Sequence, residues 1–138
     1  MTNICDTGPV VAYLNRNDPY HGWAVHVMGQ LAPPLVTCEP VLTEAAYSLR
    51  EDGLDVGPLF ELLERDALRI DFSLSAHWQR ARTLMSRYEQ MDLADAAVVV
   101  MTELYSRCQV VTVDRTDFTV YRRHDRQTID FIAPPPLR

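Results

Sequence analysis

Hydrophobic residues recur at two different spacings along the chain, and the two spacings predict strands that alternate with helices. Short apolar or β-branched runs, which are typical of buried strands, occupy residues 2–5, 35–38, 68–72, 109–113 and 128–132. Apolar residues at helical spacing predict helices that begin near Pro9, Tyr20, Pro40, Pro58, Leu74 and Leu93. Proline in the first turn agrees with a helix start, because its missing N–H has no helical partner there.

The alternation of strands and helices indicates an α/β fold with a mainly parallel sheet of four or five strands. A chain of 138 residues fits one domain, and no repeat, low-complexity segment or long linker divides it. We therefore expect residues 1–138 to form a single α/β domain.

The stretch from Met91 to Met101 places two carboxylates in the first turn of a helix that is apolar on most of its sides. Such a helix is expected between packed layers. Asp92 has the features of an N-cap, and Asp95 lies where an acid complements the helix dipole. For these two acids, a role in capping the helix and a role in chemistry both stay open. The residues expected to point inward from this helix and the one before it include Trp78, Met85, Leu93 and Leu104.

Two more acids directly follow predicted strands. Asp6 ends the first run, and Asp114 ends the run at 109–113. In parallel α/β sheets, ligands bind at the carboxyl ends of the strands, so both acids are expected at the same edge of the sheet. The helix start that carries Asp95 would face that edge as well, which brings three carboxylates together.

Carboxylates in one pocket repel each other unless a cation binds them or some are protonated. A hard divalent ion resolves this repulsion, and Mg²⁺ takes one or two carboxylates, keeps several waters and reaches substrate phosphates. The chain has no lysine, no P-loop and no paired zinc ligands. The chemistry most compatible with these residues is metal-assisted phosphodiester hydrolysis.

Composition limits the classes of protein further. The formal net charge of -6 does not indicate a polyanionic partner, because nucleic-acid-binding proteins usually carry an excess of basic residues. Cys5, Cys38 and Cys108 form no CxxC pair, so buried free thiols in a reducing compartment are expected. With neither a signal-peptide pattern nor an apolar run of about 18 residues, we expect a cytoplasmic protein with no membrane association.

Four motifs in order resemble the signature of the PIN domain. They are Asp6-Thr7-Gly8, Thr43-Glu44, residues 93–96 (LADA) and residues 112–118 (TVDRTDF). No single motif is specific, but their order and spacing over nearly the whole chain look like the VapC toxins of type II toxin–antitoxin systems. The resemblance implies a PIN-like α/β/α sandwich and a single PIN domain over residues 1–138.

The resemblance also implies roles for individual acids. The positions that match the family's catalytic acids are Asp6, Glu44, Asp95 and Asp114. Of these, Asp6 and Asp95 match the acids that hold Mg²⁺ or Mn²⁺. The hydrophobic pattern alone makes Glu44 a solvent-facing helix residue, so its assignment depends on the resemblance.

Three residues flank this set. Asp117 is an auxiliary acid by resemblance, and it is interchangeable with Asp114 as the fourth acid. Asp92 lies outside the four-acid core, as a cap or a supporting residue. Thr7 resembles a hydroxyl residue that supports the site by hydrogen bonding.

The function implied by the resemblance is Mg²⁺-dependent endoribonuclease activity, with cleavage of RNA phosphodiester bonds by metal-activated water. The protein would be the toxic component of a type II toxin–antitoxin system. Implied partners are an RNA substrate, a cognate VapB-like antitoxin and a second copy of the chain in a homodimer. Two alternatives stay open: a solitary PIN nuclease outside such a pair, and a catalytically inert PIN-fold binding module.

Three other enzyme classes fit less well. Asp6-Thr7-Gly8 matches the aspartic-protease triplet, but the helical segments contradict the β-rich fold of that class. A phosphoacceptor receiver domain needs a lysine near the acids, which this chain lacks. A HAD-type phosphatase needs a second aspartate two positions after the first, where Gly8 stands.

Two arginine-containing stretches each have a structural and a functional interpretation. Arg80, Arg82 and Arg87 are expected on a solvated helix face, with phosphate contact as the alternative. The segment from Tyr121 to His124 is expected in a surface loop, with contact to an RNA backbone as the alternative.

Overall fold

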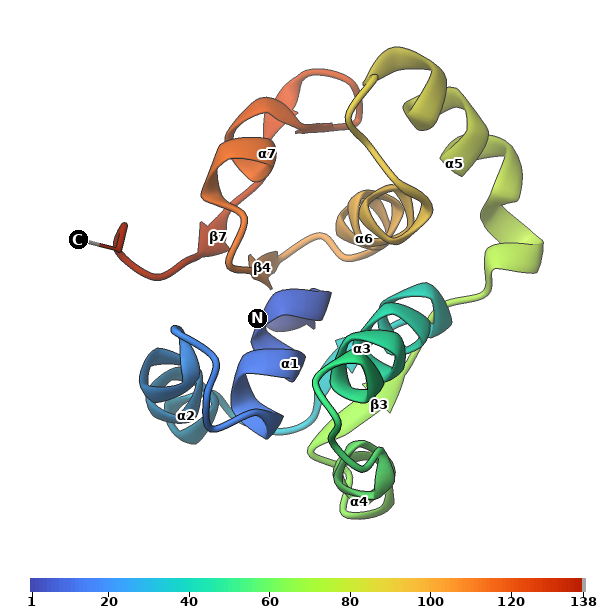
Figure 1. The fold of residues 1–138 in the computed structure, drawn as a ribbon. Coiled ribbons are helices and arrows are strands. Elements are labelled where there is room, and N and C mark those ends of the chain that lie inside the picture. Colours follow the sequence, from blue (N-terminus) through green and yellow to red (C-terminus); the bar gives the residue numbers. More distant parts are fainter. Residues whose placement is uncertain (138) are drawn as a thin grey trace.

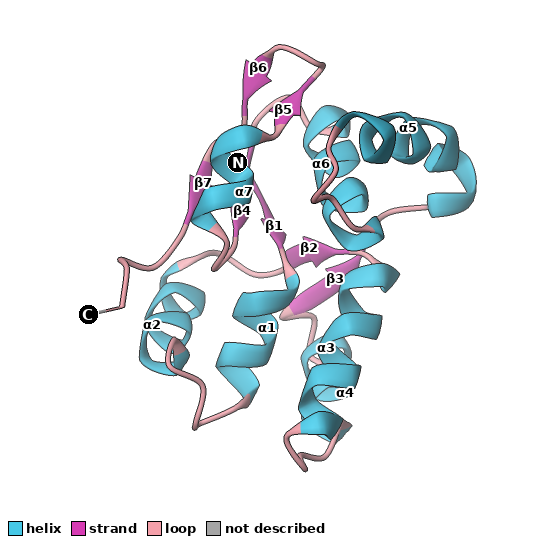
Figure 2. Ribbon diagram, turned by 45° about the horizontal axis from the view of Figure 1, so that its top comes forward, coloured by secondary structure: helices cyan, strands magenta, loops and turns pink. Residues whose placement is uncertain are grey.

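Five short strands form one parallel sheet through the centre of the molecule (Figures 1 and 2). The computed structural model describes residues 1–137. The strands are β1 Thr2–Cys5, β2 Leu35–Thr37, β3 Leu68–Ile70, β4 Cys108–Val111 and β7 Phe131–Ile132. Their order across the sheet is β3-β2-β1-β4-β7. The predicted α/β fold with a mainly parallel sheet of four or five strands is confirmed.

Seven helices connect or flank the strands within the described residues. They are α1 Thr7–Leu14, α2 His21–Gln30, α3 Glu39–Glu51, α4 Gly57–Glu64, α5 Leu74–Arg87, α6 Leu93–Leu104 and α7 Arg115–Val120. The six predicted helices are all present, and α7 was not predicted. A helix of 6 residues offers less than two turns of periodic pattern, which is why its sequence did not indicate it.

Helices cover both faces of the sheet because successive side chains along a strand point to opposite faces. Ile4 and Val110 pack in a core with residues of α5, α6 and α7. Cys5 and Val111 pack in a second core with residues of α1, α2 and α4. Figure 1 shows these layers, with α5, α6 and α7 above the strands and α1, α2, α3 and α4 below them. The predicted α/β/α sandwich is therefore confirmed.

The predicted strand over 128–132 is wrong as a single element. The chain instead forms an antiparallel ribbon of β5 Arg122–Arg123 and β6 Gln127–Thr128, visible at the top of Figure 2, and joins the parallel sheet only at β7. Ile129 lies between these two pairings and is 5% exposed. Ile129 packs in the core between the β5–β6 pairing and the β4–β7 pairing. The apolar run over residues 128–132 therefore contributes to two sheets instead of forming one strand.

The long helices α5 and α6 bury fewer of their apolar side chains than the sequence predicted. Residues Ala94 to Thr102 of α6 are buried except for Asp95, but Leu93 and Leu104 at its ends are 43% and 49% exposed. On α5, Trp78 and Met85 are 49% and 37% exposed. The expectation that these four side chains point inward is wrong, because each helix covers the core only with its middle section or one narrow side.

Two of the three arginines of α5 form ion pairs with other elements of the fold. Arg80 donates two hydrogen bonds to the carboxylate of Glu103, at 2.9 and 2.8 Å, and pairs with Asp125 at 2.7 Å. Arg87 pairs with the same Asp125 at 2.6 Å. These pairs attach the β5–β6 ribbon to α5 and α6. The expected solvated position is wrong for Arg80, which is partly buried, whereas Arg87 is exposed as expected. Arg82 is exposed, as expected.

Two expectations from composition can be compared with the structure. Cys5, Cys38 and Cys108 are buried free thiols, as predicted. Among residues 1–137, no helix is both long and apolar enough to span a lipid bilayer.

The sheet has a topological switch point between β1 and β4. From β1 the chain runs to β2 on one side, whereas β4 lies on the other side of β1. The connections that leave β1 and β4 therefore diverge and open a crevice at the carboxyl ends of these strands, where α/β proteins bind ligands. The peptide N–H of Asp6 donates to the carbonyl of Val111 at 3.0 Å, which keeps the two strand ends together up to this crevice.

Candidate active site at the carboxyl edge of the sheet

Asp6 occupies the crevice at the end of β1, in the N-cap position of α1. The residue is 7% exposed, and its Oδ2 accepts a hydrogen bond of 2.8 Å from Oγ1 of Thr112. Thr112 follows β4, is fully buried, and accepts the peptide N–H of Asp114 at 2.9 Å. A single buried hydroxyl thus connects the carboxylate after β1 to the loop after β4.

Glu44 reaches the same crevice from α3. Oγ1 of Thr7 donates to Oε1 of Glu44 at 2.9 Å, because α1 packs alongside α3. The glutamate is therefore half-buried, and the solvent-facing position that its helix pattern indicated is wrong. The supporting hydrogen bond expected of Thr7 is present. The carboxylate of Asp92 lies within hydrogen-bonding reach of Glu44.

The first turn of α6 contributes two acids with different contacts. Oδ1 of Asp92 accepts the peptide N–H of Asp95 at 2.8 Å, so the predicted N-cap is confirmed. Oδ2 of Asp95 accepts a hydrogen bond of 2.8 Å from the hydroxyl of Tyr121. Asp95 is therefore held by a side chain outside its own helix, and it lies close enough to Asp6 for the two charges to interact.

Asp114 and Asp117 both join this group through α7. Oδ1 of Asp114 accepts the peptide N–H of Asp117 at 3.0 Å, which makes Asp114 the N-cap of the helix. The structure brings Asp6, Glu44, Asp95 and Asp114 to one edge of the sheet, together with Asp92 and Asp117. Asp114 and Asp117 both stay candidates for the fourth acid.

The sequence did not indicate Thr112 or Tyr121 as parts of this site. Tyr121 is fully buried and forms edge-to-face contacts with Phe118 and Tyr88, at 5.3 and 5.1 Å between ring centroids. Its expected position in a surface loop is therefore wrong. The three-residue spacing from Phe118 to Tyr121, on one side of a short helix, was the available signal. Thr112 lies within the TVD motif, which drew attention only to Asp114.

The rest of the segment from Tyr121 to His124 is attached to neighbouring backbone. Arg123 donates to the carbonyl of Tyr105 at 2.7 Å, and Arg122 donates to the carbonyl of Thr119 at 2.8 Å. The peptide N–H of His124 donates to Glu103 at 2.7 Å. These contacts shape the segment, and contact with RNA stays a prediction.

The acids of the crevice raise one another's pKa values. Burial is the largest cause of the raised pKa of Asp6, and the charges of Asp114 and Asp92 add to it. Burial raises the pKa of Asp95 to about 7, with further contributions from Asp92 and Asp6. Within residues 1–137, no arginine forms an ion pair with any of these acids. In this part of the chain, no arginine side chain neutralises the crevice carboxylates by direct pairing.

The pKa values of Glu44 and Asp117 are raised as well. The pKa of Glu44 is raised by burial and by the adjacent Asp92, against the hydrogen bond from Thr7. Burial and the neighbouring carboxylate of Asp114 raise the pKa of Asp117 to about 6. Each of these groups would ionise more readily if a cation entered the crevice.

The donor chemistry of the crevice fits a hard divalent cation. All the available ligands are carboxylate or hydroxyl oxygens, which Mg²⁺ prefers over nitrogen and sulfur. In the described part of the chain, no group of three or more Asp, Glu, His or Cys side chains is close enough together to hold a metal ion. A Mg²⁺ ion in the crevice would therefore be held by one or two carboxylates and by several waters, which is its usual coordination in proteins.

We expect the metal-free protein to become more stable as the pH falls from about 7 to about 4. A carboxyl group with a raised folded-state pKa stabilises the fold when protonated, and this contribution is lost as pH rises through that pKa. The window follows from Asp95, at about 7 against the usual 3.8, and from Asp117, at about 6. Partial solvent exposure limits the total gain to the order of 1 kcal/mol.

Urea unfolding at several pH values in the presence of EDTA measures this effect. Glu103 has a lowered pKa because of Arg80, so its stabilising contribution is present above its usual pKa and is lost as pH falls through the lowered value. The stability gain should therefore reverse in more acidic buffer. A stability that declines steadily from neutral pH would contradict the raised pKa values of the crevice.

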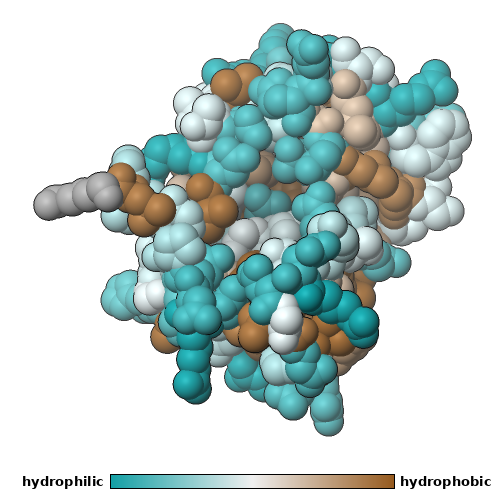
Figure 3. Space-filling model, in the orientation of Figure 1, coloured by the Kyte–Doolittle hydropathy of each residue, from teal (hydrophilic) through white to brown (hydrophobic). Residues whose placement is uncertain are grey.

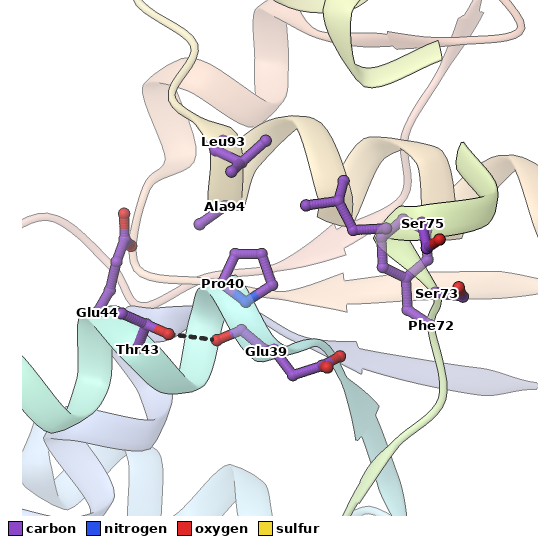
Figure 4. A pocket seen from close by; sticks show the side chains of 10 residues that line it. Glu39, Pro40, Thr43, Glu44, Phe72, Ser73, Ser75, Leu93 and Ala94 are labelled. Carbon is purple, nitrogen blue, oxygen red and sulfur yellow. Dashed lines mark hydrogen bonds between the residues drawn. The ribbon is translucent and has the colours of Figure 1, made fainter. Parts of the chain in front are cut away.

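A cavity of about 530 Å³ opens beside the acids (Figure 4). It lies between α3, the segment before α5 and the start of α6, and Glu44 forms part of its wall. Pro40, Leu93 and Ala94 line its middle, and Phe72 lines its far end. The crevice with its carboxylates is therefore continuous with a partly apolar cavity.

Two comparisons with known proteins cover most of the chain. A family model described as PIN domain matches residues 4–125. The chain is similar to the curated protein Ribonuclease VapC26 of Mycobacterium tuberculosis, with 26% identity over 123 residues, or 86% of this chain and 91% of that protein. The matched range of the family model contains all the acids of the crevice.

Proposed function

Because this chain belongs to the PIN-domain family, we propose that it is a metal-dependent endoribonuclease and the toxic component of a type II toxin–antitoxin system. The match over residues 4–125 confirms the resemblance drawn from the four motifs. The similarity to a VapC ribonuclease supports nuclease activity on RNA. The observation that carries the proposal is the group of mutually repelling carboxylates at the switch point, with no arginine paired to any of them in residues 1–137.

Asp6 and Asp95 would hold Mg²⁺ or Mn²⁺, directly or through water, and Glu44 and Asp114 would complete the acidic pocket. A bound divalent cation lowers the pKa of water and offsets the charge of a phosphoryl oxygen. Thr112 orients the carboxylate of Asp6, and Tyr121 orients that of Asp95. Both orienting hydroxyls are buried, so they restrict the positions of the two carboxylates before any ligand arrives.

Glu44 would accept the proton of the attacking water. Its raised pKa brings the carboxylate closer to the working pH of a general base, and Thr7 fixes one of its oxygens. The water oxygen forms a bond to phosphorus as its proton moves to Glu44. The bond from phosphorus to the 3′-oxygen breaks and the leaving oxygen takes a proton from solvent water, which leaves a 5′-phosphate and a 3′-hydroxyl.

The implied partners belong to this proposal as well. A VapB-like antitoxin would cover the acidic crevice, and two copies of the chain, each a single PIN domain, would form a homodimer in the cytoplasm. A small DNA-binding protein encoded just upstream would support the toxin assignment. Its absence would favour a solitary PIN nuclease. Co-expression of the neighbouring gene product should relieve growth arrest caused by the toxin.

The proposal is tested by inducing the protein in cells and mapping new RNA 5′ ends, with Asp6→Asn as the control variant. We expect new 5′-phosphate ends with the wild type and a loss of at least about 100-fold with Asp6→Asn, because the variant loses a metal-holding charge. Asn preserves the shape and can still accept the Thr112 hydroxyl. If the same ends appear with both proteins, cleavage does not depend on this site.

A further inference from the structure

The cavity beside the acids has two chemically different ends (Figure 4). Glu44 stands at one end, where the cavity meets the acidic crevice, and Phe72 stands at the other with Ser73 and Ser75. The carboxylate of Glu39 is turned toward the end formed by Phe72. A polymer whose phosphate lies at the acids would therefore extend its neighbouring unit into this cavity.

The aromatic end is held in a fixed orientation. The ring of Phe72 stacks on the ring of His77, with centroids 5.5 Å apart and planes inclined by 19°. Phe72 is half-buried and packs against the core that lies beneath α5 and α6. His77 covers one face of the Phe72 ring, so a flat group that enters the cavity would stack on the opposite face.

The charges of the cavity disfavour an anionic group. Glu39 and Glu44 are its charged lining residues, and no arginine or histidine is among them. A phosphate group is repelled by this wall, whereas a neutral group that carries N–H donors is attracted to a carboxylate. Proteins recognise unpaired RNA bases by stacking them on aromatic side chains and by hydrogen bonding to their exposed edges.

Guanine matches these groups better than the other three bases. Its Watson–Crick edge presents two adjacent donors, the N1–H and the exocyclic amino group, to the two oxygens of one carboxylate. Adenine and cytosine each present one donor beside an acceptor, and uracil presents a single donor between two acceptors. A carboxylate only accepts hydrogen bonds, so the second donor of guanine is the feature that distinguishes it from the other three bases.

We propose that this cavity binds an unpaired guanine base of the substrate RNA, next to the phosphate that is cleaved. Phe72 supplies the stacking surface and the Glu39 carboxylate accepts the two donors of the base. The inference rests on the proposed nuclease function for its biological meaning, but binding of the base itself does not require catalysis.

Nucleoside binding tests the cavity without any cleavage. Guanosine, adenosine, cytidine and uridine carry no phosphate, so each is titrated into metal-free protein while backbone amide resonances are recorded. We expect guanosine to shift the resonances of residues 72–75 and 39–44 more than the other nucleosides do. Phe72→Leu should weaken guanosine binding about 5- to 150-fold, the range that corresponds to loss of one stacked base.

Two further variants separate the contributions. Trp78→Leu replaces an exposed aromatic side chain on α5, outside this cavity, and should leave guanosine binding unchanged. Glu39→Gln keeps the size of the side chain but offers one donor and one acceptor, so the preference for guanosine should fall about 5- to 100-fold. Equal binding of all four nucleosides by the wild type, or an equal effect of Phe72→Leu and Trp78→Leu, would overturn the proposal.

Cleavage of an RNA pool with randomised sequence then tests the link to function. Sequencing of the products should show guanine enriched at one position beside the cut, and Phe72→Leu should remove the enrichment while Mn²⁺ affinity stays the same. Cuts with no base preference would overturn the guanine site and leave the nuclease proposal standing. Guanosine binding without any cleavage would support the site and count against the nuclease proposal.

A second copy of the chain is the rival occupant of this surface. Leu74 and Leu93 also line an adjoining groove with Trp78 and Met85, and Figure 3 shows hydrophobic side chains gathered at the right of the molecule beside α5. If the amide resonances of residues 72–75 depend on protein concentration and ignore guanosine, the cavity is an interface between copies. That result would overturn the proposal.

Discussion

Asp95→Asn is expected to stabilise the metal-free protein and to abolish its cleavage of RNA. Burial and the charges of Asp92 and Asp6 raise the pKa of Asp95 to about 7, so its ionised form is unfavourable in the fold at neutral pH. Asparagine removes that charge, keeps the shape, and can still accept the hydroxyl of Tyr121. Because Asp95 retains some contact with solvent, the expected gain at pH 7.5 is at most on the order of 1 kcal/mol.

The same substitution removes one of the two charges proposed to hold the metal. We expect Mn²⁺ affinity and RNA cleavage each to fall by at least about 100-fold, since even residues that only support a ligand contribute about 10- to 100-fold. Calorimetric titration with Mn²⁺ and thermal unfolding in EDTA measure the two effects on one sample. Equal Mn²⁺ affinity in wild type and variant would show that Asp95 only belongs to the start of a helix.

Asp125→Asn is the matched control for this experiment. Asp125 also carries a carboxylate near other charged groups, but Arg80 and Arg87 lower its pKa instead of raising it. Removal of its charge should therefore leave stability unchanged or reduce it, and Mn²⁺ affinity should stay the same. Opposite signs of the stability change in the two variants would distinguish a repelled acid from a paired one.

Gly8→Ala is expected to destabilise the fold and to disturb the site together. A Cβ atom at Gly8 would lie 2.2 Å from Cγ2 of Val113 and 3.2 Å from its Cβ, so the loop after β4 has to move. Overpacking of this kind costs about 1–3 kcal/mol, which exceeds the helix-propensity gain of about 1 kcal/mol for alanine. Because Val113 lies between Thr112 and Asp114, the displacement moves both of them relative to Asp6.

Thermal unfolding should show a melting temperature lower by several degrees, and Mn²⁺ affinity should fall as well. Gly22→Ala in α2 provides the control, because a Cβ atom there has nothing within 4 Å. That substitution should raise stability by up to about 1 kcal/mol and leave Mn²⁺ affinity unchanged. If Gly8→Ala behaves like Gly22→Ala, the contact with Val113 does not restrict the loop.

The sequence by itself determined the parts of this protein that depend on short-range spacing. The alternation of strands and helices, the acids Asp6 and Asp114 after two strands, and the cap formed by Asp92 were all predictable. Each is a property of a few consecutive residues, and parallel strands bring their carboxyl ends to one edge in any such fold. The convergence of Asp6, Asp95 and Asp114 followed from this rule.

Only the tertiary structure decided which side chains face the crevice from other elements. Glu44 has the spacing of a solvent-facing residue, and it turns to the site because α1 packs beside α3 and Thr7 donates to it. Tyr121 belongs to an arginine-rich stretch, yet it is buried against Phe118 and bonds to Asp95 across 26 positions of the chain. Contacts of this range depend on how layers pack, and a pattern within one element does not contain that information.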